Sequence, residues 1–148
     1  MKISVGIDVS KKNLDVYINN CKKRIVIWNN KKDLKNLAKE LQSLENCLVV
    51  LESTGSYHKL AWKELDKKGI PVSIVNPKRI RDFGKSLGRL AKTDKLDSEL
   101  ISKFGEIMEV TPTAYCSEEE EELQDYLSRR DQRWYQWRRI VWRRLVSD

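Results

Sequence analysis

Four acidic residues stand at positions where they could share metal ions. Asp8 and Glu52 each end an apolar run, whereas Asp94 and Asp97 lie three residues apart, a spacing that places two side chains on one face of a helix. Mg²⁺ and Mn²⁺ prefer carboxylate oxygens, and a pair of such ions can stabilise the attacking and leaving oxygens of a displacement at phosphorus. If the fold brings these elements together, the four carboxylates predict a metal site for phosphodiester chemistry.

Each of the four carboxylates also has a simpler interpretation. Asp8 could be a turn former or a helix cap, and Glu52 could be a polar loop residue. Asp94 could serve only the first turn of its helix, and Asp97 could face solvent. The shared placement of these residues at the ends of predicted elements favours a common site over four separate roles.

A run of basic residues leads into the second acidic pair. Such a run could bind DNA phosphates and guide a strand toward the metal ions, and Gly84 and Gly88 within it indicate a flexible loop. The simpler alternative is a solvated basic surface. Lys11, just past Asp8, could contact a phosphate as well. The predicted nucleic-acid contacts are Lys11, Lys78, Arg79, Arg81, Lys85, Arg89, Lys92 and Lys95.

Other reactive side chains give weaker signals. His58 is the only histidine, and a lone histidine is more often structural or exposed than catalytic. Because no histidine base is arranged near the serines that neighbour the site, a serine-hydrolase mechanism has little support. The three cysteines are odd in number and widely spaced, which argues against a disulfide framework and against a zinc site.

The charge balance favours a polyanionic partner. The 148 residues include 29 Lys and Arg against 22 Asp and Glu, a formal net charge of +7. Nucleic acid is the first candidate for such a partner, and an anionic membrane surface is the second. The N-terminal segment is charged too early for a signal peptide, and no apolar stretch approaches the length of a membrane span. We therefore expect a cytoplasmic protein without a membrane anchor.

Hydrophobic periodicity predicts the elements that position the carboxylates. Three short runs separated by turns indicate antiparallel strands, after which helices and strands alternate. This order predicts an α/β fold of the RNase H-like type, a mixed sheet flanked by helices. The expected strands are 3–9, 14–18, 24–28, 47–51 and 72–75, and the expected helices are 33–44, 58–68 and about 93–108.

A different kind of segment follows a break at Thr111-Pro112-Thr113. Ser117 is placed to cap a long helix, because five glutamates follow it and arginines dominate the far end, an order that complements the helix dipole. Apolar residues at near-heptad spacing predict a dimer seam. The aromatic residues Trp134, Trp137 and Trp142 could also stack on unpaired bases.

Four ordered motifs resemble those of a known family. They are VGIDVSK at 5–11, LESTGSY at 51–57, VNP at 75–77 and KTDKLD at 92–97. In this order they closely resemble the N-terminal domain of the DEDD transposases of the insertion-sequence-110 family. That family includes the Piv-type DNA invertases, and its fold is similar to that of the Holliday-junction resolvase RuvC. The resemblance implies that Asp8, Glu52, Asp94 and Asp97 are a catalytic tetrad that binds Mg²⁺ or Mn²⁺.

The resemblance also implies partners and a further domain. Family members recombine DNA at specific sites, and some are guided by a structured RNA. A helix like the one after Ser117 supports homo-oligomers. Complete members continue into a C-terminal domain that carries a nucleophilic serine, which these 148 residues do not include.

We therefore expect an RNase H-like DEDD catalytic domain at 1–110 and a coiled-coil-like helical arm at 111–148. The expected function is divalent-metal-dependent cleavage and strand transfer of DNA by a transposase or site-specific recombinase. The alternatives are a Holliday-junction-type endonuclease on the same fold and a non-catalytic module for nucleic-acid binding or dimerisation. Metal-dependent cleavage separates both enzymes from the module, and a preference for junctions separates the two enzymes.

Overall fold

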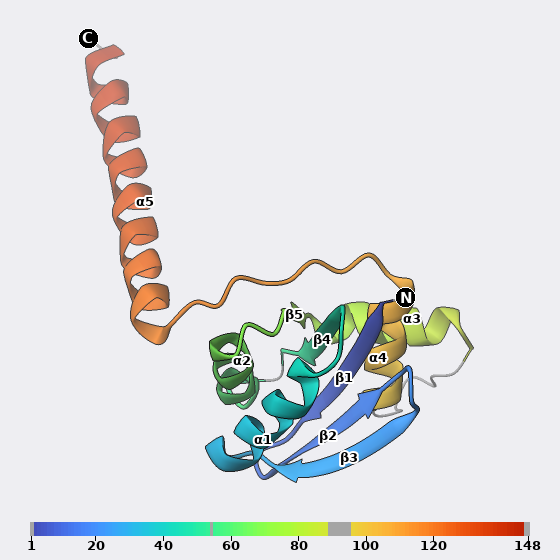
Figure 1. The fold of residues 1–148 in the computed structure, drawn as a ribbon. Coiled ribbons are helices and arrows are strands. Elements are labelled where there is room, and N and C mark those ends of the chain that lie inside the picture. Colours follow the sequence, from blue (N-terminus) through green and yellow to red (C-terminus); the bar gives the residue numbers. More distant parts are fainter. Residues whose placement is uncertain (1, 54, 89–95, 147–148) are drawn as a thin grey trace. The chain divides into compact units, whose positions relative to one another are not determined.

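The computed structural model describes residues 2–53, 55–88 and 96–146, with the side chains of residue 135 and of residues 137–146 outside the description. The chain divides into two compact units, Met1–Tyr115 and Cys116–Asp148. In the first unit, helices surround a sheet, and the second unit contains one long helix (Figure 1).

A mixed five-stranded sheet organises the first unit. Its spatial order is β3-β2-β1-β4-β5. The antiparallel half pairs β1 with β2 and β2 with β3, and the parallel half pairs β1 with β4 and β4 with β5. The strands are β1 (Ile3–Val9), β2 (Asn13–Ile18), β3 (Lys23–Trp28), β4 (Cys47–Glu52) and β5 (Val72–Val75). The mixed sheet and all five strands predicted from the sequence are confirmed, with boundaries within one residue.

Helices cover both faces of this sheet (Figure 1). On one face, α1 (Lys31–Gln42) and α2 (His58–Lys67) pack against the apolar side chains of the strands. On the other face, α4 (Ser98–Ile107) crosses β1, β2 and β4 and also contacts α3 (Pro77–Ser86). Because side chains alternate along a strand, β1 sends Ile3, Val5, Ile7 and Val9 into the first layer, whereas Ser4, Gly6 and Asp8 face α4.

Small residues let α4 lie directly on β1. The Ser4 hydroxyl donates to the Ser102 carbonyl at 2.7 Å, and the Ser102 hydroxyl donates to the Ser4 carbonyl at 2.8 Å. A Cβ added at Gly6 would lie 2.2 Å from the Ser98 carbonyl oxygen, and one at Gly105 would lie 2.5 Å from the Ser4 hydroxyl. The start of α4 is therefore pressed against the middle of β1, at a distance that only glycine permits.

Two expectations about the region after β5 are wrong. Residues 77–86 form a helix where a flexible loop was expected, because Asn76 caps it through a bond from the Lys78 amide (2.9 Å) and Pro77 suits its first turn. The buried Ile80 and Gly84 anchor this helix against the domain. The next helix begins at Ser98, later than the expected start near residue 93.

The segment after α4 covers one edge of the sheet. It is extended, and the Thr113 amide donates to the Val72 carbonyl (2.8 Å) while the Thr113 hydroxyl oxygen accepts from the Ile74 amide (3.0 Å). Tyr115 packs edge-on against Trp62 of α2. These bonds occupy backbone groups of β5 that an edge strand would otherwise leave open.

The second unit contains the long helix α5 (Glu118–Val146), which confirms the helix expected after Ser117. The Ser117 hydroxyl oxygen accepts from the Glu120 amide (3.2 Å), and Glu120 in return accepts from the Ser117 amide (2.9 Å). This reciprocal pair is a capping box, and it fixes where the helix starts. No helix in the described part of the chain is long and apolar enough to cross a membrane.

Candidate active site

Asp8 and Glu52 end neighbouring parallel strands. The registered pair Ile7–Leu51 joins β1 to β4, and the two carboxylates follow this pair directly. On β1, Ser4 and Gly6 face α4, so the alternation of the strand places Asp8 on that face as well. On β4, Val50 faces α4, which places the buried Glu52 there too. The sheet thus presents two carboxylates on one face, at the carboxyl ends of its central strands.

Asp97 supplies a third carboxylate at the start of α4. It is the N-cap of this helix, with an extended backbone (φ −115°, ψ 165°), and its Oδ1 accepts from the Leu100 amide at 2.8 Å. The expectation that Asp94 and Asp97 share a helix face is therefore wrong for Asp97, because a capping residue precedes the helix. Asp94 lies outside the described residues.

The donor chemistry of these residues suits a hard divalent cation. Carboxylate oxygens from β1, β4 and the start of α4 are the ligand type that Mg²⁺ and Mn²⁺ prefer. Within residues 2–53, 55–88 and 96–146, no three acidic, histidine or cysteine side chains lie close enough together to hold an ion. The structure therefore places Asp8, Glu52 and Asp97 on one face of the sheet without closing them into a complete metal centre.

A fourth acidic residue near this site escaped the sequence analysis. Asp15 on β2 is the direct partner of Asp8 across the antiparallel pair. Its Oδ1 accepts from the Ser98 hydroxyl at 3.0 Å, which shows that it also faces α4. The available signal was the alternation of β2, in which Asp15 lies between the buried Leu14 and Val16 and must face the opposite side.

Arg24 on β3 binds Asp15 from the other side. Its Nε lies 3.1 and 3.2 Å from the two carboxylate oxygens of Asp15, and its Nη2 lies 3.1 Å from Oδ2. The hydrogen bond to Asp15, followed by the charge of that carboxylate, raises the pKa of Arg24. The negative charges of Asp97 and Glu99 raise this pKa further, so the guanidinium lies in the electric field of the α4 start.

Asn29 ties together two loops that follow the carboxylate-bearing strands. Its Nδ2 donates to the Ser10 carbonyl after β1 (3.0 Å) and to the Tyr57 carbonyl before α2 (3.2 Å). Its backbone amide donates to the Lys12 carbonyl at 2.8 Å. The sequence offered only its place directly after β3 as a signal, so its role as a connector between the two loops was not foreseen.

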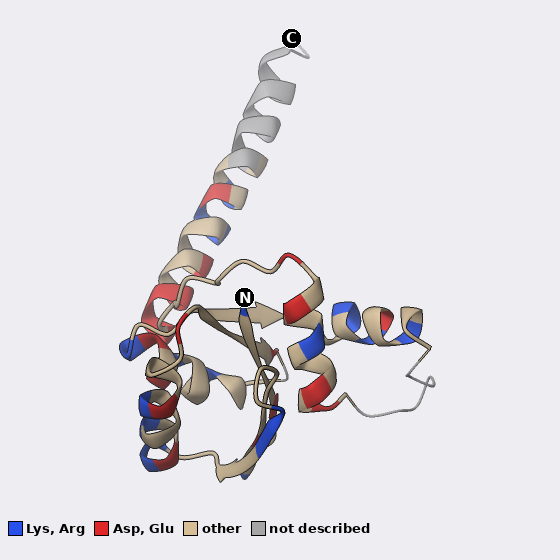
Figure 2. Ribbon diagram, turned by 45° about the vertical axis from the view of Figure 1, so that its right-hand side comes forward, with Lys and Arg blue, Asp and Glu red and all other residues tan. Residues whose placement is uncertain are grey.

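The predicted phosphate contacts divide into three groups. Lys11 lies exposed in the turn after β1. On α3, Lys78, Arg79 and Lys85 are exposed and Arg81 is half-buried, and Figure 2 shows basic residues along this helix. The Arg79 guanidinium lies 5.4 Å from the centre of the Phe104 ring on α4, so it also has a packing role. Outside the described residues lie Arg89, Lys92 and Lys95.

His58 belongs to the packed interior rather than to this site. It is buried at the start of α2, and its ring stacks on Trp62 with centroids 6.4 Å apart. This placement agrees with the structural role expected of a lone histidine.

Residues 5–145 match the sequence model of a protein family described as transposases, the insertion-sequence-110 family with the DEDD motif. The chain belongs to this DEDD transposase family. Pilin gene-inverting proteins of Moraxella bovis and Moraxella lacunata are each 32% identical to it over 114 residues. The alignment with either protein covers 70% of this chain and 34% of the relative. The transposase-family chain therefore spans about a third of the length of the curated relatives it matches.

Solved structures confirm the fold of this transposase domain. RuvC of Thermus thermophilus in complex with a Holliday junction substrate superposes with a TM-score of 0.54 at 13% identity, covering 76% of this chain and all of that one. A second Thermus thermophilus RuvC structure gives the same TM-score at 12% identity over 75% of this chain and 99% of that one. The predicted RuvC-like, RNase H-like architecture is confirmed.

Proposed function

We propose that this domain performs the metal-dependent phosphodiester chemistry of a DNA transposase or invertase. The observation that carries the proposal is the placement of Asp8 and Glu52 at adjacent strand ends, with Asp97 starting the helix on the same face. Asp8, Glu52, Asp94 and Asp97 would hold Mg²⁺ or Mn²⁺. When bound, these ions would offset the charge that develops on the phosphate during displacement.

The residues of the chain would hold and align the DNA strand. Three cationic side chains on α3 (Lys78, Arg79 and Lys85) are exposed, and they would bind backbone phosphates without reading sequence. Lys11 would contact a phosphate next to Asp8. The nucleophile would be either water or, as the resemblance implies, the serine of a further domain.

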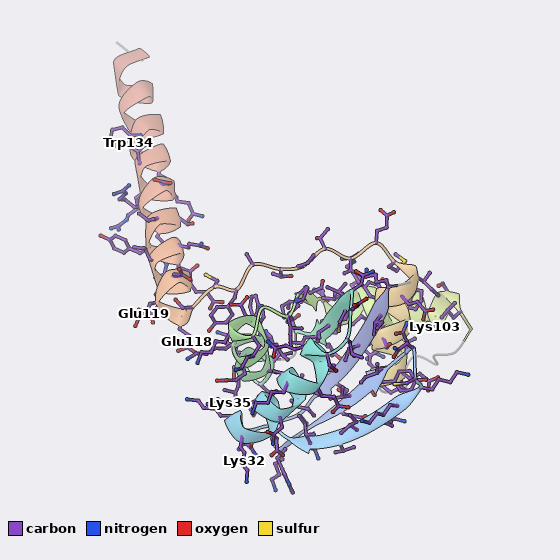
Figure 3. All side chains as sticks on the ribbon, viewed as in Figure 1. Lys32, Lys35, Lys103, Glu118, Glu119 and Trp134 are labelled. Atoms are coloured by element: carbon purple, nitrogen blue, oxygen red, sulfur yellow. The ribbon has the colours of Figure 1, made fainter. Side chains whose placement is uncertain are left out.

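Two further partners belong to this proposal. A structured guide RNA, which the resemblance implies for some family members, would be a second nucleic-acid partner. Homo-oligomers would form through α5, where Leu123, Leu127 and Trp134 are exposed apolar residues at near-heptad spacing. Figure 3 shows Trp134 on this helix, beyond Glu118 and Glu119 at its start.

Calorimetric titration of the 148-residue chain with Mn²⁺ and Mg²⁺ tests the metal site. Asp8→Asn and Glu52→Gln each remove a proposed ligand charge, and we expect each to weaken binding by at least about tenfold. The matched control is Glu106→Gln, which removes an exposed carboxylate from the last turn of α4 and should leave affinity unchanged.

Cleavage of DNA with Mn²⁺ present then separates the candidate functions. Cleavage of linear DNA that contains one end of the transposable insertion sequence supports the transposase. Cleavage confined to four-way junctions favours the resolvase-type endonuclease. A folded protein that binds DNA, but that neither binds Mg²⁺ or Mn²⁺ nor cleaves any DNA, would support only the non-catalytic binding module. Retention of metal binding by both Asp8→Asn and Glu52→Gln would refute the assignment of these ligands.

A further inference from the structure

We propose that Asp15 and Arg24 are a positioning pair, which holds the first turn of α4, and with it the Asp97 carboxylate, against the strands that carry Asp8 and Glu52. Neither residue touches the reacting groups in this proposal. The inference rests on the proposed function only in treating Asp97 as a metal ligand.

Asp15 is the point at which three elements meet. The Ser98 hydroxyl of α4 donates to Asp15 Oδ1 at 3.0 Å, and Ser98 is fully buried. The Arg24 guanidinium on β3 binds both oxygens of the same carboxylate at 3.1 to 3.2 Å. A two-oxygen contact of this kind fixes the orientation of a carboxylate, and not only its distance. Arg24 thereby holds Asp15 in the position from which it accepts the Ser98 hydrogen bond.

The Asp97 carboxylate moves with the turn that Ser98 anchors. Asp97 precedes Ser98 directly, and its Oδ1 bonds back to the Leu100 amide of the same helix. The location of Asp97 relative to β1 and β4 therefore follows from the location of the first turn of α4. Gly6 permits that turn to approach closely, whereas the hydrogen bond to Asp15 attaches it at a defined point on β2.

Charge balance gives Arg24 a second role in the same arrangement. Asp15 and Asp8 are direct cross-strand partners on one face of the sheet, and like charges opposite each other destabilise such a pair. The positive charge of Arg24 offsets the negative charge of Asp15, which reduces the repulsion between the Asp15 and Asp8 carboxylates. Without Arg24, repulsion would drive Asp15 away from Asp8 and from the Ser98 hydroxyl.

The variant Arg24→Gln in the 148-residue chain tests the pair, with Arg24→Lys as a conservative rescue. A matched control is Lys23→Gln, because Lys23 adjoins Arg24 on β3 and forms an exposed ion pair with Glu40 of α1. The readouts are Mn²⁺ affinity by calorimetry and hydrogen exchange of the Leu100 and Ile101 amides. Thermal unfolding verifies that each variant is folded.

We expect Arg24→Gln to weaken Mn²⁺ binding about threefold to tenfold, which corresponds to the loss of roughly one hydrogen bond of ordinary net strength. Exchange of the Leu100 and Ile101 amides should become faster by a similar factor. Arg24→Lys should fall between wild type and Arg24→Gln, and Lys23→Gln should match wild type in both measurements.

The proposal is overturned if folded Arg24→Gln matches Lys23→Gln in amide exchange and in Mn²⁺ affinity. Should wild type bind no Mn²⁺, the metal site of the proposed function fails separately, and amide exchange alone decides the positioning role. If Arg24→Gln does not fold, Ser98→Ala removes one bond of the same link, and unchanged exchange of Leu100 in that variant overturns the proposal.

Discussion

At the scale of single residues, Gly6 sets how closely α4 approaches the sheet. A Cβ at this position would lie 2.2 Å from the Ser98 carbonyl oxygen and 2.3 Å from the Ser102 amide nitrogen. Both are backbone atoms, so the clash can be relieved only by moving α4 and β1 apart. Because Asp97 caps that helix, the position of a proposed ligand depends on the absence of a side chain at Gly6.

We expect Gly6→Ala to lower the free energy of unfolding by about 3 kcal/mol, at the upper end of the cost of overpacking. The control Gly69→Ala introduces a methyl group into open space, where only its positive φ of 70° causes strain. That control should cost about 1 kcal/mol. Urea unfolding monitored by circular dichroism measures both, and equal losses would contradict the close approach of α4.

Cys47 gives a second prediction at this scale. Burial raises the pKa of its thiol from 9.0 to about 11, because the thiolate is the form that loses hydration. Thiolate is the reactive species, and a two-unit rise lowers its fraction about a hundredfold. At pH 8 we expect iodoacetamide to label Cys47 about a hundredfold more slowly in the folded protein than in the urea-unfolded chain, as measured by mass spectrometry. Equal labelling rates of Cys47 in the folded and unfolded protein would contradict this assignment.

The same shift predicts a loss of stability in alkaline solution. The folded pKa of Cys47 lies above the unfolded one, so the unfolded chain releases this proton first as pH rises. The stabilising contribution is complete below about pH 9 and is lost progressively up to about pH 11. Between about pH 9 and pH 11, the melting temperature of Cys47→Ala should therefore fall less steeply than that of wild type. An equally steep fall in the variant would show that other groups cause the loss of stability.

At the scale of elements, apolar patterning predicted the strands because each strand contributes to a buried layer. The helix at residues 77–86 was missed because its basic residues and two nearby glycines resemble a loop, whereas Asn76, Pro77 and the buried Ile80 determine the outcome. The start of α4 was placed too early because both Thr93 and Asp97 can precede a helix, and only packing selects between them.

The sequence predicted only those residues of the candidate site that lie at the end of a strand or the start of a helix. Asp8 and Glu52 follow from strand ends, and their proximity follows from parallel pairing. The roles of Asp15 and Arg24 depend on the register between β2 and β3, which places Arg24 opposite Tyr17 and therefore diagonal to Asp15 on the same face of the sheet. The turn between the two strands sets this register, and apolar patterning alone does not reveal it. Asn29 acts through loop geometry, for which periodicity carries no information.

The helix α5 gives a prediction about assembly. The exposed apolar side chains on it include Leu123 and Leu127, which are 57% and 37% exposed and lie four residues apart. If they form a seam between two copies, Leu127→Gln should weaken dimerisation by at least about tenfold, because a buried leucine contributes 2 kcal/mol or more. Sedimentation velocity over a concentration series measures this. Ser128→Ala is the control outside the seam, and monomeric wild type at all concentrations would refute the seam.

At the scale of the whole molecule, the net charge of +7 should make DNA affinity depend steeply on salt. Apart from Lys11, the described DNA contacts that we propose lie on α3, which adjoins α4. Lys32 and Lys35 lie instead on α1, which packs with the layer on the other face of the sheet (Figure 3). Only the former group belongs to the proposed binding surface. Substitution of single lysines can therefore distinguish DNA binding through the overall charge of the protein from DNA binding through a defined surface.

We expect Lys85→Gln to reduce the slope of log affinity against log salt by about one, with a uniform loss across DNA sequences. Lys35→Gln removes the same charge from α1 and should leave this slope nearly unchanged. Fluorescence anisotropy with a labelled duplex at salt concentrations from about 50 to 200 mM measures both variants. Equal reductions in slope would indicate that the protein binds DNA through its overall charge.

The extended segment that carries Thr113 has a consequence for dividing the protein into fragments. Thr113 forms hydrogen bonds with the Val72 carbonyl and the Ile74 amide, and the Tyr115 ring packs against Trp62. A fragment that stops at residue 110 would uncover the free side of β5, and open strand edges recruit one another into aggregates. A fragment that continues to Tyr115 keeps this edge closed. We therefore expect a fragment that keeps the residues between α4 and α5 up to Tyr115 to stay monodisperse, and a fragment that lacks them to aggregate.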